Sequence, residues 1–328
     1  MRLRVLLATP SSPERLHTLM PWAWALRTAG HETQIAGRPD FVEAITATGF
    51  VAVPVGPEGA DGTRLDLPED AEGIADHALR WRPEMVLWDG AAPAAADAAA
   101  RCGATSVAAL GPYEHPAHPG AHLTYDCLPP SLREPDGTAR GQERTGVRFV
   151  PYDGSGELPS WLGRKIRRPR VLVLGELAPQ TVAALLSSAE GLKAELLCRL
   201  PQDRVPAGVR LPSQIRLLDS VPVMATLPTC TAVVHDGSAA LTMAAATLGL
   251  PQLVVGDGPQ GTVAAVADRL AAYGAALVAA PGGPVPALPS LVEDPGPAER
   301  ARLLAKEITG LPTPREAVAR LVEAAAAR

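Results

Sequence analysis

Short apolar runs alternate along this chain with segments in which apolar residues recur every three to four positions. The first run spans Arg4–Ala8, and helical periodicity follows over Leu16–Ala29 up to Gly30, which is expected to cap the helix. A short apolar run indicates a buried strand, whereas the longer period indicates an amphipathic helix. Because the two patterns keep alternating, the sequence predicts a parallel sheet with helices on its faces.

The same two patterns predict the other elements. In the first half, strands are expected at 32–36, 51–55, 83–89 and 105–110, with helices at 40–48 and 91–102. Residues 112–169 are rich in proline and predict irregular structure. In the second half, strands are expected at 170–174, 195–199, 215–218, 232–235, 253–255 and 276–279, with helices at 178–190, 238–248, 262–273, 297–309 and 313–326.

The restart of the alternation divides the chain into two doubly wound α/β halves. We expect a first domain over 1–150, a linker over 151–169 and a second domain over 170–310, with a last helix at 311–328 that packs back towards the first domain. Ligands of such sheets bind at the carboxyl ends of the strands. The expected site is therefore the cleft between the two halves.

Composition narrows the function classes. The chain of 328 residues is 47% hydrophobic but only 4% aromatic, and its formal net charge is −5. Without a basic stripe, nucleic acid is not an expected partner. No apolar run reaches the roughly 18 residues of a membrane span, and the short apolar start favours a first strand over a signal peptide. A cytoplasmic protein with reduced, scattered cysteines is therefore expected.

The most informative stretch begins where an apolar run ends at His235. A turn at Gly237 follows, then an Ala-rich helical pattern, then a second apolar run. This order predicts a βαβ unit, and the amino end of its helix is a potential anion site, because free backbone N–H groups and the helix dipole both favour negative charge there.

Several longer blocks follow one another along the chain: M-P-W-A-W-A-L-R-T-A-G-H-E at 20–32, P-E-M-V-L-W-D at 83–89, G-V-R-F-V-P-Y-D-G at 146–154 and I-R-L-L-D-S-V-P-V-M-A-T-L-P-T-C-T-A-V-V-H-D-G at 215–237. In these blocks the chain resembles the two-domain (GT-B) glycosyltransferases of actinomycete natural-product pathways. Such enzymes move deoxysugars from nucleoside diphosphates to polyketide-like acceptors. The resemblance implies two Rossmann-like domains facing across a cleft.

The resemblance also implies where the reacting groups lie. Its catalytic histidine falls at Arg15, which cannot act as a base because a guanidinium does not lose its proton. A replacement base would have to be His17, Glu14 or Asp89. The resemblance also implies a deletion of tens of residues after Tyr113, where relatives build the acceptor pocket, so the acceptor region is expected to be truncated.

In the second half, the resemblance assigns the ligand contacts to Gly175, Val221, His235, Gly237, Ser238 and Gln260. Two acidic residues, Glu176 and Asp236, stand where neutral or basic groups would face the diphosphate. Like-charge repulsion there would cost on the order of 1–4 kcal/mol per close contact. Alternatively, the two carboxylates form a new acid–base pair.

A metal site is not expected. His115, His118 and His122 share one loop, but neither a cysteine nor an acid supports them as ligands. No cofactor is required, although a nucleoside diphosphate or a dTDP- or UDP-sugar would bind if sugar transfer is retained.

Because the departures fall on every part of the site, the sequence favours a protein that has lost sugar transfer. Its cleft would perform acid–base chemistry, such as cyclisation, elimination or isomerisation, on a polyketide-like small molecule. Two alternatives stay open: an active glycosyltransferase, and a non-catalytic partner of one. A homodimer also stays open.

Overall fold

The computed structural model describes residues 2–59, 62–113, 120–133, 143–163, 165–189, 191–199, 211, 213–218, 222–255, 262–279 and 287–327. The chain separates into two compact units, and each is described here by itself. The first unit joins Met1–Gly154 to the last segment, Leu311–Arg328, and the second unit is Ser155–Gly310.

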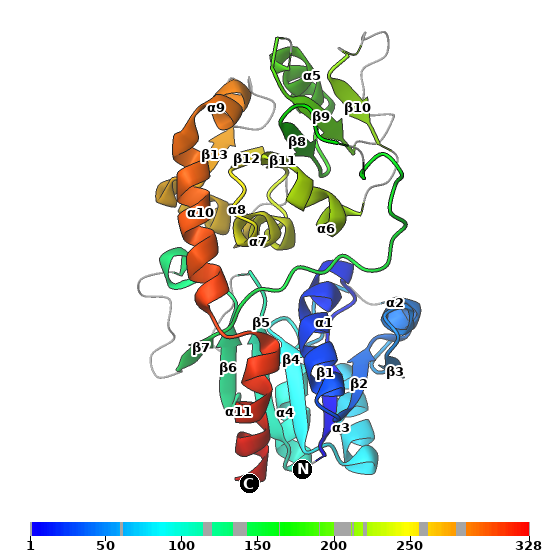
Figure 1. The fold of residues 1–328 in the computed structure, drawn as a ribbon. Coiled ribbons are helices and arrows are strands. Elements are labelled where there is room, and N and C mark those ends of the chain that lie inside the picture. The colour runs from blue at the N-terminus through cyan, green and yellow to red at the C-terminus, as the bar shows by residue number, and fades with distance from the viewer. Residues whose placement is uncertain are drawn as a thin grey trace. The chain divides into compact units, whose positions relative to one another are not determined.

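Seven parallel strands form the sheet that the structure describes in the first unit, in the order β3-β2-β1-β4-β5-β6-β7 (Figure 1). The strands are β1 (Arg4–Ala8), β2 (Glu32–Gly37), β3 (Val51–Pro54), β4 (Met85–Asp89), β5 (Thr105–Leu110), β6 (Leu123–Asp126) and β7 (Arg144–Gly146). Strands β1, β4 and β5 are almost continuously apolar and buried, as expected for the centre of a parallel sheet.

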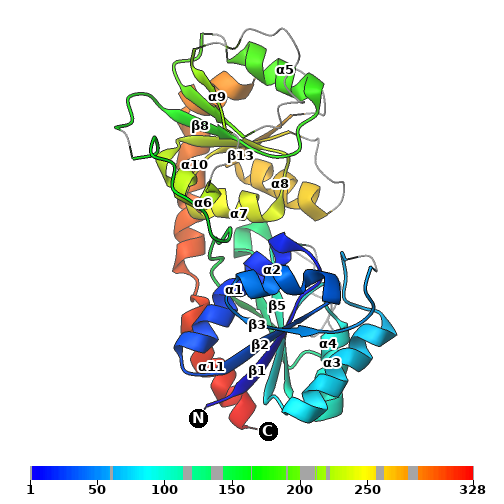
Figure 2. The same ribbon diagram turned by 90° about the vertical axis from the view of Figure 1, so that its right-hand side faces the viewer.

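Helices cover both faces of this sheet. They are α1 (Pro13–Thr28), α2 (Val42–Ala47), α3 (Pro68–Trp81), α4 (Ala94–Cys102) and α11 (Pro314–Ala326). Figure 2 shows α3 and α4 on one face and α1 with α11 on the other. Trp88 of β4 packs in the core beneath α3 and α4, where its indole N–H donates to Ser106.

The second unit has a sheet whose described strands are also all parallel, in the order β10-β9-β8-β11-β12-β13. They are β8 (Arg170–Val173), β9 (Glu195–Cys198), β10 (Ile215–Leu217), β11 (Ala232–His235), β12 (Gln252–Val255) and β13 (Ala276–Ala279). Its helices are α5 (Pro179–Ser188), α6 (Val223–Thr226), α7 (Ala239–Thr247), α8 (Thr262–Tyr273), α9 (Ala287–Glu293) and α10 (Pro295–Gly310). Figure 2 shows α5 and α9 on one face and α7 and α8 on the other.

The strand order of each unit reverses direction at one point, as in doubly wound nucleotide-binding folds. In the first sheet the reversal lies between β1 and β4, and in the second between β8 and β11. The predicted α/β class with two Rossmann-like parallel sheets is thus confirmed. Ligands of such sheets bind beside the carboxyl ends of the two strands at the reversal, so these ends are where functional residues are sought.

Parts of the predicted element map are wrong. The stretch 112–169 was expected to be irregular, but it contains β6 and β7, which extend the sheet beyond β5. Helix α3 falls in a segment for which no element was expected, and α1 begins at Pro13 rather than Leu16. The earlier start follows from Ser12, whose side chain accepts the Arg15 N–H as an N-cap.

None of the helices within the described ranges combines the length and the apolar character needed to cross a bilayer.

Candidate functional site

Arg15 and Asp89 form an ion pair at the strand reversal of the first unit. Asp89 is the last residue of β4, and Arg15 comes from the first turns of α1. The Arg15 Nη1 donates to Asp89 Oδ1 over 2.6 Å, and the Ala91 backbone N–H donates to the same oxygen over 2.8 Å. Arg15 also lies 3.9 Å above the ring centre of Tyr113. The guanidinium is therefore held by a carboxylate and an aromatic face together.

This pairing limits Asp89 as a proton acceptor. The Asp89 side chain is only 1% exposed, and burial raises the pKa of its carboxyl while the charge of Arg15 opposes the rise. Its Oδ1 already accepts two hydrogen bonds. Two of the residues expected at the reacting position thus engage each other, so neither is a ready base for a substrate hydroxyl.

His17 lies two residues further along α1 and is half-buried. Its ring meets the ring of Tyr152 edge to face, with the centres 5.2 Å apart. Neither ring nitrogen makes a hydrogen bond within the described part of the chain. Burial lowers the pKa of the imidazole, while the charges of Asp153 and Glu14 partly oppose this. A neutral imidazole with unengaged nitrogens can accept a proton at pH 7.

Glu14, the third candidate base, lies in the first turn of α1, and its backbone carbonyl accepts the Thr18 hydroxyl. Its carboxylate acts on His17 through charge. The structure thus gathers Glu14, Arg15, His17 and Asp89 in the first unit, with His17 and Asp89 in different surroundings.

In the second unit, His235 is fully buried at the end of β11. Its Nδ1 accepts the Gly237 backbone N–H over 3.0 Å, so the ring proton is assigned to Nε2, which donates to Gln252 Oε1 over 2.8 Å. The Gln252 amide in turn donates to the Thr242 carbonyl in α7. Burial lowers the pKa of the imidazole, which keeps it neutral. His235 therefore shapes the turn, and any ligand contact of its ring would first require breaking a hydrogen bond.

The turn itself leads into the amino end of α7. Gly237 has φ +93, a conformation that a residue with a side chain rarely adopts. Ser238 caps the helix, because its hydroxyl accepts the Leu241 N–H over 3.4 Å. The first turn of α7 follows directly, and it belongs to a helix of nine residues.

Asp236 joins this turn to the loop that follows β8. Its Oδ2 accepts the Glu176 backbone N–H over 2.9 Å, and its Oδ1 accepts the Ser238 N–H over 3.1 Å. Gly175, with φ +110, lies directly beneath the carboxylate: a Cβ at this glycine would meet Asp236 Cγ at 2.5 Å. The carboxylate thus engages backbone donors on both loops at the strand reversal.

The structure therefore brings six of the expected residues of the second half together: Gly175, Glu176, His235, Asp236, Gly237 and Ser238. The side chain of Glu176 is exposed, and its backbone N–H donates to Asp236. Val221 and Gln260 lie outside the described residues.

Of the three loop histidines that were considered as metal ligands, the structure describes one. His115 and His118 lie outside the described residues, and His122 accepts the Ser106 backbone N–H through Nδ1. Among the residues that the structure describes, no group of three His, Cys, Asp or Glu side chains could hold a metal ion.

Three residues at the first-unit site were not expected from the sequence: Tyr113, Tyr152 and Asp153. The last two lie in the block G-V-R-F-V-P-Y-D-G that carries part of the resemblance. The resemblance of that block was the one sequence feature that pointed to Tyr152 and Asp153. It does not indicate which residue either side chain contacts. Tyr113 follows the carboxyl end of β5, next to the strand of Asp89, which is also where ligands gather in such sheets.

Comparison with known proteins shows which family the chain is similar to. Residues 183–324 match the family described as erythromycin biosynthesis protein CIII-like, C-terminal domain, and residues 24–67 match the corresponding N-terminal domain. Tylactone mycaminosyltransferase of Streptomyces fradiae is 31% identical over 77% of this chain and 76% of its own length. The 10-deoxymethynolide desosaminyltransferase of Streptomyces venezuelae is 28% identical over 99% and 97% of the two chains.

Solved structures agree over the full length. The spinosyn forosaminyltransferase SpnP is similar with a TM-score of 0.86 and 28% identity, covering 99% of this chain and all of that one. The glycosyltransferase VinC in complex with dTDP is similar with a TM-score of 0.85 and 27% identity over the same shares.

This chain is also shorter than its relatives. The alignment with the desosaminyltransferase runs over 421 positions, more than the 328 residues of this chain, so gaps in this chain make up the difference. The similarity in sequence and fold, taken together, shows that this chain belongs to the family of two-domain (GT-B) glycosyltransferases of actinomycete antibiotic biosynthesis.

Proposed function

We propose that this protein is an active glycosyltransferase, which moves a sugar from a nucleoside diphosphate to a hydroxyl group of an apolar natural product. The comparisons favour this alternative over the expected loss of sugar transfer, because the relatives that align over nearly the whole chain are sugar transferases. The glycosyltransferase VinC and the spinosyn rhamnosyltransferase SpnG are among the similar proteins solved with thymidine diphosphate, and SpnG is also solved with spinosyn aglycone.

The observation that carries the proposal is the turn between β11 and α7. His235, Gln252 and Thr242 hold it through a chain of buried hydrogen bonds, and Gly237 gives it a conformation suited to close approach of a ligand. A helix amino end placed at a strand reversal can neutralise a leaving diphosphate through backbone donors and the helix dipole. On this basis transfer needs no metal ion.

We assign the role of base to His17. The imidazole takes the proton of the acceptor hydroxyl, and the hydroxyl oxygen forms a bond to the anomeric carbon. The bond from that carbon to the diphosphate oxygen breaks, and the nucleoside diphosphate leaves with the electron pair. Arg15 cannot take this proton, and Asp89 is engaged by Arg15, which leaves His17 as the half-buried neutral group among these candidates.

A second candidate function is favoured by one observation. The Asp236 carboxylate accepts hydrogen bonds from the N–H groups of Glu176 and Ser238, which are donors that a diphosphate at this turn would use. If the carboxylate is never displaced, the site would instead perform acid–base chemistry on the natural product itself.

Binding and transfer together decide between the two. Calorimetry of the full chain with dTDP and with UDP measures donor binding, and mass spectrometry after incubation with a dTDP-sugar and a hydroxylated aromatic acceptor detects the glycoside. We expect binding of one nucleotide and a product heavier by one sugar. The variant H17N should lower the rate of transfer by 10²–10⁴-fold and leave nucleotide binding unchanged. H77N, on the distant helix α3, is the matched control. A wild-type chain that binds neither nucleotide and forms no glycoside would refute the proposal.

A further inference from the structure

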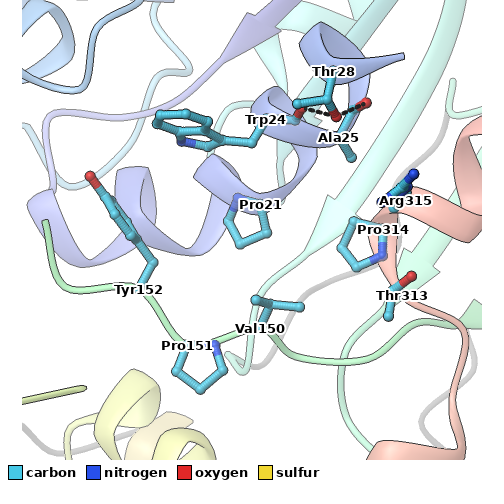
Figure 3. A pocket seen from close by; sticks show the side chains of 10 residues that line it. All are labelled: Pro21, Trp24, Ala25, Thr28, Val150, Pro151, Tyr152, Thr313, Pro314 and Arg315. Carbon is cyan, nitrogen blue, oxygen red and sulfur yellow. Dashed lines mark hydrogen bonds between the residues drawn. The ribbon is translucent and has the colours of Figure 1, made fainter. Parts of the chain in front are cut away.

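A cavity of about 360 Å³ opens in the first unit beside α1. Its walls come from the outer face of α1, from the segment that leads to Tyr152 and from the start of α11 (Figure 3). Rings supply much of this wall: the indole of Trp24, the phenol of Tyr152 and the pyrrolidines of Pro21, Pro151 and Pro314. The volume lies in the range of small-molecule sites, and a slot lined by rings suits a flat apolar ligand.

One end of the cavity lies beside the proposed base. His17, Pro21, Trp24 and Thr28 are spaced four, three and four residues apart, so they form one stripe along α1. The last three line the cavity, and His17 is the next position of the stripe. Tyr152, which also lines the cavity, packs its ring edge to face against the ring of His17.

The other end of the cavity carries a positive charge. Figure 3 shows Tyr152 and Arg315 at opposite ends of the lining. The Arg315 side chain is exposed and makes neither an ion pair nor a hydrogen bond with any described residue. It lies in the first turn of α11, where the helix dipole disfavours a cation. The charge of Arg315 therefore does not stabilise the helix, and the guanidinium is available to bind a ligand.

Two further polar groups at the cavity are similarly available. The Trp24 indole N–H and the Tyr152 hydroxyl have no hydrogen-bond partner within the described ranges. A mainly apolar cavity with a few unengaged polar groups is the usual composition of a small-molecule site.

From these contacts we infer that the cavity binds the acceptor, and that the acceptor is a flat, apolar ring system with two different ends. Its reacting hydroxyl lies at the His17 end, and an acidic group, a carboxylate or phenolate, lies at Arg315. The identity of this ligand as the acceptor rests on the proposed function, whereas its binding does not.

The binding test uses 6-hydroxy-2-naphthoate, whose hydroxyl and carboxylate stand at opposite ends of a flat ring system, and its neutral counterpart 6-hydroxy-2-naphthamide. Calorimetry on the full chain, without any nucleotide, should show the acid bound about 3- to 10-fold more tightly than the amide. R315Q should abolish this preference and leave the affinity for the amide unchanged. R101Q, an exposed arginine at the end of α4, should keep the wild-type preference.

W24A should weaken both probes by 10-fold or more, because the indole supplies stacking area. Trp24 also packs against Phe50, so thermal unfolding of W24A is measured in parallel, and R315Q decides alone if W24A unfolds. Equal binding of acid and amide by the wild type, or an unchanged preference in R315Q, would overturn the inference.

The transfer arm separates this inference from the proposed function. With a dTDP-sugar present, the wild type should glycosylate the 6-hydroxyl, and R315Q should raise the KM for the naphthoate with little change in kcat. Tight, Arg315-dependent binding without any glycoside would refute the proposed function and the acceptor role but keep the binding site. Transfer to the naphthoate that is insensitive to R315Q would refute the site and keep the function.

Discussion

At the scale of single residues, Arg15 changes what its neighbours can do. Its guanidinium pairs with the charge of Asp89 and covers the ring of Tyr113. Three side chains at the carboxyl ends of the strands of the first sheet are therefore fixed in one cluster. His17 stays outside this cluster and has unengaged ring nitrogens among the described residues. Under the proposed function, proton transfer therefore depends on the surroundings of the His17 imidazole, which are set by burial, by Tyr152 and by two nearby carboxylates.

We predict the pH dependence of transfer from these surroundings. Burial lowers the pKa of His17 below its ordinary value of 6.5, so the neutral, proton-accepting form dominates at pH 7, and kcat/KM should fall only as pH drops below 6.5. Asp153 raises the pKa of His17, so D153N should move the acidic limb of the profile to still lower pH. D97N, an exposed residue of α4, should leave the profile in place. An acidic limb at or above pH 6.5, or no displacement in D153N, would contradict this assignment.

Asp236 supports a second prediction at this scale. Its carboxylate bridges the N–H groups of Glu176 and Ser238, so a diphosphate at this turn must overcome both the occupied donors and a like charge. D236N removes the charge and keeps the shape. The dissociation constant for dTDP should therefore fall by about 10-fold or more, measured by calorimetry. E176Q, whose side chain is exposed, should change it less. Weaker dTDP binding by D236N would instead make the carboxylate part of the binding site.

These residue contacts mark the limit of what the sequence could predict. Asp236 stood out because an acidic residue interrupts a turn where anions are expected. Its partner, the N–H of Glu176, is 60 positions away and depends on the register of β8 against β11. The pairing of Arg15 with Asp89 spans 74 positions and could not be predicted for the same reason. Spacing along a sequence fixes neighbours within an element, but not which loops meet at the edge of a sheet.

At the scale of elements, the sequence pattern predicted the central strands, because a strand such as Thr105–Leu110 is buried along its whole length, but it missed β6 and β7 beyond it. Helix α3 was missed although Ala71, Ile74, Ala75 and Ala78 have helical spacing. Gly73 interrupts its propensity, and the structure shows why a glycine stands there: a Cβ would come within 3.3 Å of the backbone and side chain of Val55. The close contact with Val55 thus requires a glycine at this position, although glycine has a low helix propensity.

The element that connects β11 to α7 gives a prediction about stability. Burial lowers the pKa of His235, so the unfolded chain binds more protons than the folded chain below the ordinary pKa of 6.5. The contribution of His235 to the free energy of unfolding is therefore fully present above pH 6.5. It is lost as pH falls below that value, by up to about 1.4 kcal/mol per pH unit.

The measurement is the free energy of unfolding in urea at pH 7.5 and at pH 5.5, for the wild type and for H235N. Other histidines with lowered pKa values, including His31 and His77, contribute to both proteins, so the difference between the two pH dependences isolates His235. The wild type should lose more stability on acidification than H235N. Parallel pH dependences would show that the imidazole is protonated without cost in the folded state.

At the scale of the whole molecule, the chain returns to its first unit after completing the second. Helix α11 buries Ala317, Val318 and Leu321. The Arg148 N–H donates to the Pro312 carbonyl just before it. A capping box between Thr313 and Glu316 sets where the helix begins. The second unit, by contrast, is built from one continuous segment, so removing α11 should affect the two units unequally.

We predict that a chain ending at Gly310 loses stability in its first unit and keeps it in its second. Without α11 the apolar face of α1 is exposed to water and the cavity loses the wall that Pro314 and Arg315 supply. Hydrogen exchange followed by mass spectrometry should then show faster exchange in β1, β4 and β5, with β8, β11 and β12 unchanged.

L321A, which removes one fully buried side chain, should give the same pattern more weakly, at a cost of about 2–5 kcal/mol. The exposed variant R320A is the control on the same helix. Equal acceleration in both sheets would mean that the two units unfold as one, and unchanged exchange in the first would mean that α11 is dispensable to it.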